Sequence, residues 1–420
     1  MSYNIFGISE RVESWVQEQE EALRPLFSNL KRVKEATTLR VMEAFHHCAI
    51  RDIHFHSYTG YAYDDPGREA TEEVYARVFG TEDALVRPAI ASGTHALSLM
   101  LFGCLRSGDE LLIISGAPYD TLHSVIGIDK KNGATLTERG IRYSQVDLTA
   151  DGRFDPVKIG EALVTKPKMV YVQRSQGYSF RNGFTKEEID AMISLIREKS
   201  PSSIIAFDNC YGEFTSISEP GHWGVDIFAG SLIKNPGGGL VSSGGYIAGR
   251  ADLIEQCSYQ LTAPGIGKEI GGTFGTTRSV LQGLLFAPTV TYHALKSAAL
   301  FAKCYEQLGY EVNPPFDGER QDIIEAIKLG NEENLLAFCE EIQKASPVDS
   351  HLLPVPGDMP GYTDQVIMAA GTFVQGSSIE LSADGPLREP FIVYLQGSLL
   401  YEQGKLALMR TIQRLHPHMM

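Results

Sequence analysis

The 420-residue chain has few of the features that mark secreted, membrane-spanning or nucleic-acid-binding proteins. Its 37 lysines and arginines are outnumbered by 52 aspartates and glutamates, which gives a formal net charge of −15. Nucleic acids and anionic membranes attract clustered positive charge, so neither is expected as a partner. No apolar run is long enough to cross a membrane, and the N-terminal residues contain no apolar signal core.

Cysteine is also scarce. The six cysteines are scattered along the chain, and no two of them form a CxxC pair. This spacing is typical of free thiols in a reducing compartment rather than of a disulfide framework. We therefore expect a cytoplasmic protein.

The motifs for metal and nucleotide binding are incomplete. Histidines pair up at residues 46–47 and 54–56, but no cysteine or carboxylate is spaced to complete a metal site. Residues 265–269 lack the Ser or Thr and the preceding glycine of a P-loop. The glycines of residues 237–245 do not give GxGxxG between a strand and a helix. We expect no metal, and a nucleotide-binding protein is improbable.

What the chain does contain is an alternation of strand-like and helix-like segments. Its composition is 43% hydrophobic and 21% charged, which is enough for a large core and more than one domain. Helical patterns at 94–105 and 185–199 separate short apolar runs. Alternation of this kind predicts an α/β fold, with a mainly parallel sheet covered by helices on both faces. The apolar runs are 84–91, 111–115, 168–173, 203–208, 226–232 and 245–249.

We divide the chain into three parts. Residues 1–58 form an N-terminal helical segment, helical over 9–47, that packs on the small domain or on a partner subunit. Residues 59–308 form a large domain that ends in a long helix at 277–308. Residues 309–420 form a smaller α+β domain, because strand-like alternation replaces the earlier pattern. Its elements are runs at 365–374, 377–382 and 391–396 and a closing helix near 400–415.

Lys234 follows the apolar run 226–232 and precedes three glycines. Burial disfavours an ammonium group, so a lysine at the end of a buried strand is expected to have a pKa depressed to about 7–8. The free amine can then form an imine, which makes Lys234 a candidate Schiff-base lysine. Taken alone, Lys234 has an equally good structural explanation as a lysine that leaves the sheet into solvent.

Asp208 ends the apolar run 203–208, which is unusually hydrophobic for a segment that holds a carboxylate. The carboxyl ends of parallel strands border the crevice where α/β proteins bind ligands. An aspartate there can pair with a protonated pyridine nitrogen and keep the ring an electron sink. A lone aspartate more often caps the next turn, so the combination of Asp208 with Lys234 carries the hypothesis.

A phosphate site is expected where run 84–91 meets the next helix. Ser92, Gly93 and Thr94 form a small-residue turn whose amides and hydroxyls would meet an anion at the positive end of that helix. An ordinary helix cap by Ser92 or Thr94 is compatible with this role. Further along the chain, Ser231 could add a hydroxyl and Tyr119 could stack on a planar ring, with His95 a weaker stacking candidate. Together these residues predict a pyridoxal 5'-phosphate (PLP) site.

At this point the residues resemble the Cys/Met-metabolism class of PLP-dependent enzymes, which contains the cystathionine and methionine lyases. Asp208–Tyr211 resembles that family's Asp-Asn-Thr-Tyr, and Ser231–Lys234 resembles its Ser-x-x-Lys. Three longer segments are similar to its bacterial branch, the aluminium-resistance or methionine gamma-lyase family proteins. They are Thr59–Arg68, Thr262–Lys268 and Arg388–Gly397.

The resemblance extends over nearly the whole chain and implies the PLP-dependent transferase fold type I, with a mainly parallel seven-stranded sheet. It implies a homodimer or homotetramer with shared active sites, in which Tyr61 reaches the neighbour's cofactor phosphate. Lyases have Tyr-x-Arg here, whereas this chain has Tyr63 in place of the arginine. Arg68 or Lys268 would have to replace that arginine. Tyr63 is kept as a candidate cofactor-binding residue.

The implied activity is that of a carbon–sulfur lyase acting on a sulfur-containing amino acid by β- or γ-elimination, of the cystathionine β-lyase or methionine γ-lyase type. Lys234 would take the Cα proton, and Tyr61 or Tyr119 would protonate the leaving sulfur. An arginine would hold the substrate carboxylate. We expect Arg388 in that role, ahead of Arg174 and Arg278. An aminotransferase, an aldolase or a PLP-binding stress-response protein with little turnover remain alternatives.

Overall fold

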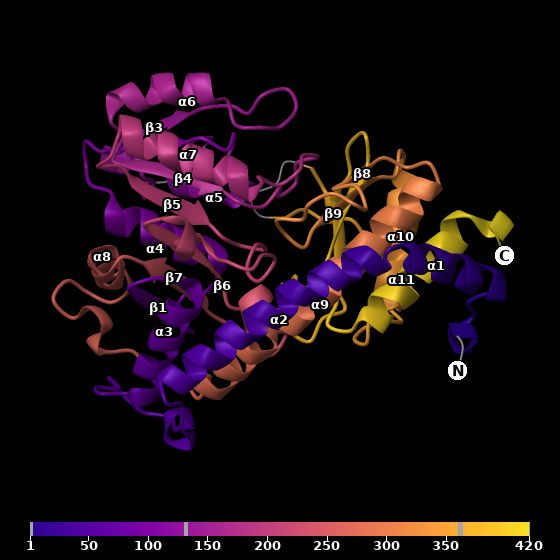
Figure 1. Cartoon of the computed structure of the whole chain (residues 1–420), viewed down its shortest axis with the longest axis horizontal. Coiled ribbons are helices and arrows are strands. Elements are labelled where there is room, and N and C mark those ends of the chain that lie inside the picture. Colours follow the sequence, from indigo (N-terminus) through magenta and orange to yellow (C-terminus); the bar gives the residue numbers. More distant parts are fainter. Residues whose placement is uncertain (1–2, 130–132, 360–363, 420) are drawn as a thin grey trace.

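A computed structural model describes residues 3–129, 133–359 and 364–419 of the chain. Two β-sheets lie beside each other, the larger on the left of Figure 1 and the smaller on the right. Helices α2 and α9 pack along one another and bridge the two sheets. The predicted α/β fold with a second, smaller sheet is confirmed.

The larger sheet has seven strands in the order β1-β7-β6-β5-β4-β2-β3. Its neighbours pair in parallel from β6 through β3, whereas β7 runs antiparallel to both β1 and β6. The prediction of a mainly parallel sheet is therefore confirmed. The strands are β1 (Asp83–Arg87), β2 (Glu110–Ile113), β3 (Arg142–Gln145), β4 (Met169–Gln173), β5 (Ile204–Asp208), β6 (Ile227–Ser231) and β7 (Gly245–Gly249).

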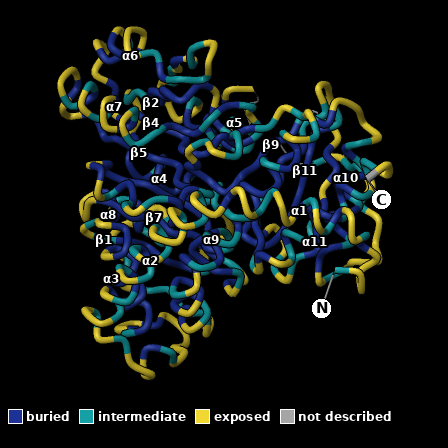
Figure 2. The backbone as a smooth tube through the Cα atoms, turned by 45° about the vertical axis from the view of Figure 1, so that its right-hand side comes forward, coloured by how far each residue is buried: buried dark blue, intermediate teal, exposed yellow. Residues whose placement is uncertain are grey.

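Helices cover both faces of this sheet, so its central strands are buried throughout (Figure 2). One core packs α4, α5 and α8 against one face, and a second packs α2, α3, α6, α7 and α9 against the other. Strands buried on both faces read as continuous apolar runs, which is why the sequence revealed them. The helices are α3 (Pro66–Phe79), α4 (Gly93–Cys104), α5 (Asp120–Ile126), α6 (Pro156–Ala162), α7 (Lys186–Lys199), α8 (Ala251–Leu261) and α9 (Thr277–Gln307).

The smaller sheet has five strands in the order β10-β11-β12-β9-β8, and all of its pairs are antiparallel. Helices α10 and α11 pack with it in a separate hydrophobic core. Its elements are β8 (Val312–Asn313), β9 (Glu325–Lys328), α10 (Glu332–Lys344), β10 (Val366–Ala369), β11 (Ser382–Pro386), β12 (Ile392–Gln396) and α11 (Tyr401–Leu415).

The N-terminal helices join the two regions. Helix α1 (Glu10–Ala22) packs against α9 and α11, and α2 (Arg24–His47) packs against α9 and α3. Pro25 stands in the first turn of α2, a position that tolerates proline because the missing amide would have no helical partner. The N-terminal segment thus contacts elements of both expected domains, and the boundaries at residues 58 and 308 remain predictions.

Three strand predictions were wrong in detail. Of the run 365–374, only Val366–Ala369 forms a strand. The run 84–91 ends as a strand at Arg87, because Pro88 has no amide to donate to a neighbour. Residues 377–381 are not a strand, and β11 begins only at Ser382. In that segment the Glu380 carboxylate accepts the amides of Phe373 and Val374 at 2.8 and 2.9 Å, which bends the chain. Short-range alternation could not reveal this side-chain contact.

Candidate functional site

A cavity of about 210 Å³ opens at the carboxyl edge of the larger sheet. It lies where β4, β5 and β6 end and where α4 and α5 begin, which is the usual place for ligands in open α/β sheets. Seven of the residues singled out from the sequence line it: Ser92, Gly93, Thr94, Tyr119, Asp208, Ser231 and Lys234. The other lining residues are Leu97, Thr121, Leu122, Gln173, Ser175, Cys210, Tyr211, Ile233 and Gly376.

Asp208 is the last residue of β5 and stands between β4 and β6, opposite Gln173 and Ala229. Its side chain is buried, and its Oδ1 accepts the amide of Cys210 at 3.0 Å. Burial raises the pKa of Asp208, while the charge of Lys234 acts in the opposite direction. The buried carboxyl of Asp208 thus meets the cavity in a setting that favours a cationic partner.

Lys234 lies three residues beyond β6 in a tight turn, and its Nζ is 3.8 Å from the centre of the Tyr211 ring. Burial acts to lower the pKa of Lys234, but Cys210, Tyr211 and Asp208 act against it, and the net shift is upward. The expectation of a depressed pKa is therefore wrong for this cavity. Burial alone would lower the pKa, but the fold also brings Cys210, Tyr211 and Asp208 around the amine, and sequence does not reveal these neighbours.

Two sets of contacts fix the turn after Lys234: hydrogen bonds from Asn235 and a close backbone contact with α9. The Asn235 side chain donates to the carbonyls of Tyr211 and Glu213, both at 3.0 Å. On the other side, a Cβ at Gly283 of α9 would collide with the carbonyl of Gly237, so helix and loop meet backbone to backbone. This close approach requires glycine and fixes the path of the chain beyond the lysine.

The expected phosphate turn begins α4. The Ser92 hydroxyl accepts the amide of His95 at 3.1 Å, and the Thr94 and Thr121 hydroxyls are 2.9 Å apart. A Cβ at Gly93 would lie 3.3 Å from Cys210 Sγ and 3.4 Å from the Ser231 Cβ, so the backbone comes close to the end of β6. These neutral donors at a helix N-terminus fit a phosphate group.

His95 was expected to stack on the ligand, and the structure does not support that role. Its Nδ1 accepts the amide of Ala91 at 3.0 Å, and the residue does not line the cavity. The ring therefore fastens the turn before α4. Tyr119, the other stacking candidate, does line the cavity, and it is packed edge-on by Tyr178, with ring centres 6.1 Å apart.

Nine lining residues were not predicted from the sequence as site residues, and three of these lie beside Asp208 or Lys234. Gln173 ends β4 directly opposite Asp208, and its Oε1 is buried without a hydrogen-bond partner in the part of the chain that the structure describes. Cys210 and Tyr211 follow Asp208 and surround the Lys234 amine. The signal for Gln173 was available, because a polar residue ending the neighbouring strand of a parallel sheet reaches the same edge.

Tyr61 and Tyr63 do not line this cavity. Both are exposed, at 67% and 61%, and their ring centres are 5.5 Å apart. The amide of Gly271 donates to the carbonyl of Tyr61 at 3.1 Å, which ties this loop to the segment before α9. Their role toward a neighbouring subunit stays a prediction.

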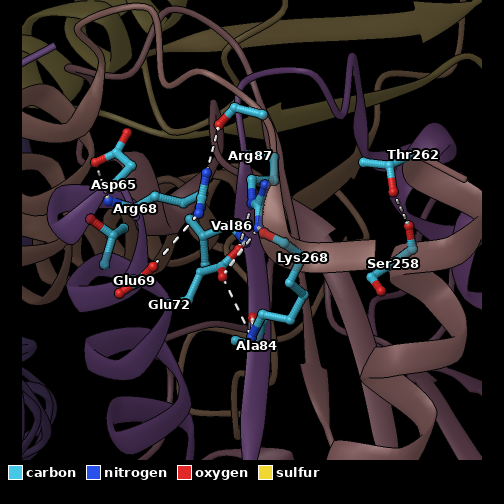
Figure 3. Close-up of polar contacts among 12 residues, drawn as sticks. Asp65, Arg68, Glu69, Glu72, Ala84, Val86, Arg87, Ser258, Thr262 and Lys268 are labelled. Carbon is cyan, nitrogen blue, oxygen red and sulfur yellow. Dashed lines mark hydrogen bonds and ion pairs between the residues drawn. The ribbon is translucent and has the colours of Figure 1, made fainter. Parts of the chain in front are cut away.

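The two proposed substitutes for the missing arginine have other partners (Figure 3). Arg68 is 2% exposed and donates to the carbonyl of Ala62 at 2.7 Å. Lys268 forms ion pairs with Asp83 and with Glu72. These cations hold the chain's own loops together, so the idea that either reaches a neighbour's phosphate is not supported.

The expected substrate arginine lies away from this cavity, and its role stays a prediction. Arg388 lies outside the cavity lining, is 55% exposed at its side chain and pairs with Asp364 at 3.0 Å. Arg174 is fully buried and donates to Asn209 at 2.8 Å, while Arg278 is exposed and lies over the Phe55 ring. None of the three lines the cavity. A side chain in a β-turn points away from the sheet as easily as toward it, and sequence does not settle the direction.

The cavity residues fit PLP. The lining combines an amine and a buried carboxyl from successive strand ends with a tyrosine ring and with the hydroxyls and amides at the start of α4. Among the described residues, no group of three or more His, Cys, Asp or Glu is arranged to hold a metal ion. Within the same residues, no helix is long and apolar enough to span a membrane.

Comparison with known proteins gives one consistent family. The family model described as methionine gamma-lyase matches residues 12–416. The uncharacterized protein YnbB of Bacillus subtilis (strain 168) is 46% identical over 407 residues, 97% of either chain. The solved structure of a carbon–sulfur lyase involved in aluminum resistance from Clostridium novyi NT is 45% identical, covers 98% of this chain and 97% of its own, and has a TM-score of 0.94.

A second solved structure agrees. It is a candidate cystathionine beta-lyase involved in aluminum resistance from Listeria monocytogenes, 48% identical, with a TM-score of 0.93, over 95% of this chain and 98% of that one. At the level of fold alone, the PLP-dependent protein YhfS of Escherichia coli, 16% identical, superposes over 91% of this chain and 96% of its own with a TM-score of 0.60. The fold is that of the PLP-dependent fold type I enzymes.

Proposed function

Since the chain belongs to the methionine gamma-lyase family, we propose that it is a PLP-dependent carbon–sulfur lyase that releases a thiol from a sulfur-containing amino acid. The observation that carries the proposal is the meeting of Lys234 and Asp208 on one cavity. The two relatives with solved structures, one named a carbon–sulfur lyase and one a candidate cystathionine beta-lyase, support the reaction class.

The proposed cofactor contacts follow from the lining residues. Lys234 would hold PLP as a Schiff base, Asp208 would pair with its pyridine nitrogen and Tyr119 would stack on its ring. Ser92, Gly93, Thr94 and Ser231 would hold the phosphate through hydroxyls and amides. When bound, PLP supplies an electron sink that makes the substrate Cα proton removable.

The protein's own groups would then act in sequence. Once the substrate's amino group has displaced it, the free Lys234 amine would take the Cα proton, and the turn at Asn235 fixes its backbone for this role. The Asp208 carboxylate would hold the proton on the ring nitrogen. The Tyr119 hydroxyl gives a proton to the departing sulfur, with Tyr61 of a neighbouring subunit as the alternative donor.

The proposal includes a homodimer or homotetramer in the cytoplasm. Tyr61 and Tyr63 are exposed aromatic side chains on one loop, a composition that is enriched at protein interfaces. The cysteines are free thiols in the described residues, as expected in a reducing compartment.

The test begins with spectroscopy. Apoprotein titrated with PLP should turn yellow, and borohydride reduction followed by peptide mapping should place the reduced cofactor on Lys234. Sulfur amino acids should then yield thiol, keto acid and ammonia, whereas serine and alanine should yield no thiol. Lys186→Ala, which removes a lysine paired with Asp190 outside the cavity, is the matched control. A reducible imine that persists in Lys234→Ala would reject the cofactor site, and transamination without thiol release would reject the lyase.

A further inference from the structure

The segment that follows β4 joins the cavity to the smaller sheet. Tyr178 in this segment donates its hydroxyl to Asp384 of β11. Tyr394 of β12 stacks on the Tyr178 ring, with centres 4.8 Å apart, and donates to the Tyr178 carbonyl at 2.8 Å. One tyrosine of the larger region is thus held at its ring, its backbone and its hydroxyl by the smaller sheet.

The acceptor of this contact is itself held in place. Asp384 is 4% exposed, and its Oδ1 accepts the Gln396 side chain at 2.6 Å. Burial raises the pKa of Asp384 to about 7, and the Gln396 hydrogen bond acts in the opposite direction. The ionisable groups around it are Tyr178, Tyr394 and, beyond Tyr394, Arg388. A buried carboxyl with two fixed partners makes a directional anchor.

The other end of the segment contacts the cavity. The Tyr178 ring meets the Tyr119 ring edge-on at 6.1 Å. A Cβ at Gly177 would lie 3.4 Å from Tyr119 Cδ2 and 3.0 Å from Gln173 Nε2, so the backbone of the segment touches both lining residues. The amide of Gln176 donates to Asp322 at 2.8 Å, a second tie to the smaller region. Tyr119 therefore packs against a segment whose position the smaller sheet determines.

We propose that Tyr178 and Asp384 are positioning residues for Tyr119, and that their contact sets the plane of the stacking ring over the bound cofactor. The inference rests on the proposed function only for the identity of the cofactor. Tyr178 and Asp384 act through Tyr119 and do not line the cavity. The contact makes the stacking geometry depend on how the smaller sheet sits against the larger one.

The experiment measures PLP binding to the apoprotein and the visible circular dichroism of the bound cofactor, which reports ring orientation. Tyr178→Phe and Asp384→Asn should each raise the PLP Kd by about three- to tenfold, the worth of one hydrogen bond. Both should weaken the visible dichroism band. In a Tyr119→Ala background the same substitutions should have no further effect on Kd, because a residue that acts through Tyr119 has nothing left to position.

Two matched controls lie in the smaller region away from the cavity. Tyr310→Phe removes a hydroxyl that contacts His416 at 3.2 Å, and Asp358→Asn alters a carboxylate that accepts the Gln365 side chain at 3.2 Å. Both should keep the wild-type Kd and dichroism band.

A wild-type Kd and dichroism band in Tyr178→Phe would overturn the proposal, as would an effect that persists when Tyr119 is alanine. Tyr178→Phe removes only a hydroxyl. If Asp384→Asn does not fold, Tyr178→Phe alone therefore tests the positioning role. Neither readout involves turnover. A protein that binds PLP as described but releases no thiol would therefore reject the lyase and leave the positioning role standing.

Discussion

Two clusters of buried charge lie at the larger sheet, and they differ in how their charges are paired. In the arginine cluster, which we define as Arg68, Glu72, Arg87 and Lys268 (Figure 3), each cation has protein partners. Arg87 Nε donates to Glu72 at 2.6 Å, and its Nη1 donates to the Ile270 carbonyl at 2.8 Å. In the cavity, Asp208 is buried and Lys234 is half-buried, and the Lys234 amine rests over the Tyr211 ring.

This difference in pairing distinguishes charged residues that stabilise the fold from charged residues that are available to a ligand. Glu72 also accepts the amide of Val86 at 3.1 Å, so the arginine cluster ties β1 to α3 and to the loop before α9. Its members have fixed partners, and none of them lines the cavity that holds Asp208 and Lys234. The cavity pair keeps its reactive atoms toward open space, which costs stability and makes the atoms available to a ligand. The comparison predicts that substitutions in the first cluster damage folding and those in the second damage chemistry.

Lys234→Ala should produce the largest effect. Loss of the amine should lower Cα-proton exchange in a sulfur amino acid by about 10²–10⁴-fold, the usual contribution of a positioned base. The unfolding free energy should fall only slightly, because the groups around the amine stabilise its charged form but Asp208, whose pKa burial raises, can take up a proton once the cation is gone. Exchange measured by NMR in deuterated buffer, together with denaturant unfolding, checks both expectations. A large loss of unfolding free energy would instead indicate that Lys234 mainly stabilises the fold.

Arg87→Leu should lower the unfolding free energy and leave PLP binding intact. It leaves Glu72 buried without its main partner, which should cost about 3–5 kcal/mol of unfolding free energy. Replacing both members, as in Arg87→Met with Glu72→Leu, should restore much of that loss. Arg250→Leu is the control, because its partly exposed pair with Asp252 should contribute under about 1 kcal/mol. If Arg87→Leu folded normally but lost PLP, the division between the clusters would fail.

A pH effect comes from Glu213, which lies beside the cavity. Its side chain is fully buried, it accepts the Tyr246 hydroxyl at 2.7 Å, and burial raises its pKa from 4.5 to about 8. At pH values between 4.5 and about 8, Glu213 is protonated in the folded protein but ionised in the unfolded chain. Stability should therefore fall as the pH rises from 4.5 to about 8, by at most about 1.4 kcal/mol per pH unit from this group.

Glu213→Gln should flatten this slope. Unfolding midpoints measured in urea at several pH values between 5 and 8 would check it. Glu325, whose burial also raises its pKa to about 8, should leave a residual slope of the same sign. An unchanged slope in the glutamine variant would mean that Glu213 is ionised in the folded protein.

The smallest effect is expected for Arg388→Leu. Its exposed pair with Asp364 should contribute under about 1 kcal/mol, and the KM for thiol release should stay within about threefold of wild type. A tenfold or larger rise in KM with unchanged kcat would show that Arg388 binds the substrate, as the family resemblance implies. Asp364→Asn, which keeps the arginine but removes its partner, distinguishes loss of the pair from loss of the guanidinium.

The sequence revealed those parts of the site that depend on strand ends. Asp208 and Lys234 follow apolar runs, and parallel strands bring their carboxyl ends to one edge whatever the rest of the chain does. The sequence did not reveal that His95 accepts the amide of Ala91, a contact within the turn that precedes α4. The upward pKa shift of Lys234 depends on Cys210 and Tyr211, whose distance from the amine only the fold determines.

The smaller sheet was harder to predict. Its strands β8 and β9 have two and four residues, and β9 ends in a half-buried lysine that weakens any apolar pattern. The tie between Tyr178 and Asp384 joins residues 206 positions apart, for which the sequence offers no spacing rule. Side-chain contacts between segments this far apart in the sequence become known only from the folded structure.

The bare backbone contact between Gly283 and Gly237 has a mechanical consequence. Helix α9 has 31 residues, meets the loop after Lys234 at Gly283 and packs near its other end with β9. Neither glycine at this contact carries a side chain, so a tilt of the helix would displace the loop that follows Lys234. A displacement of the far end of α9 would thus change how the Lys234 amine is presented to a ligand, although every residue that lines the cavity stays the same.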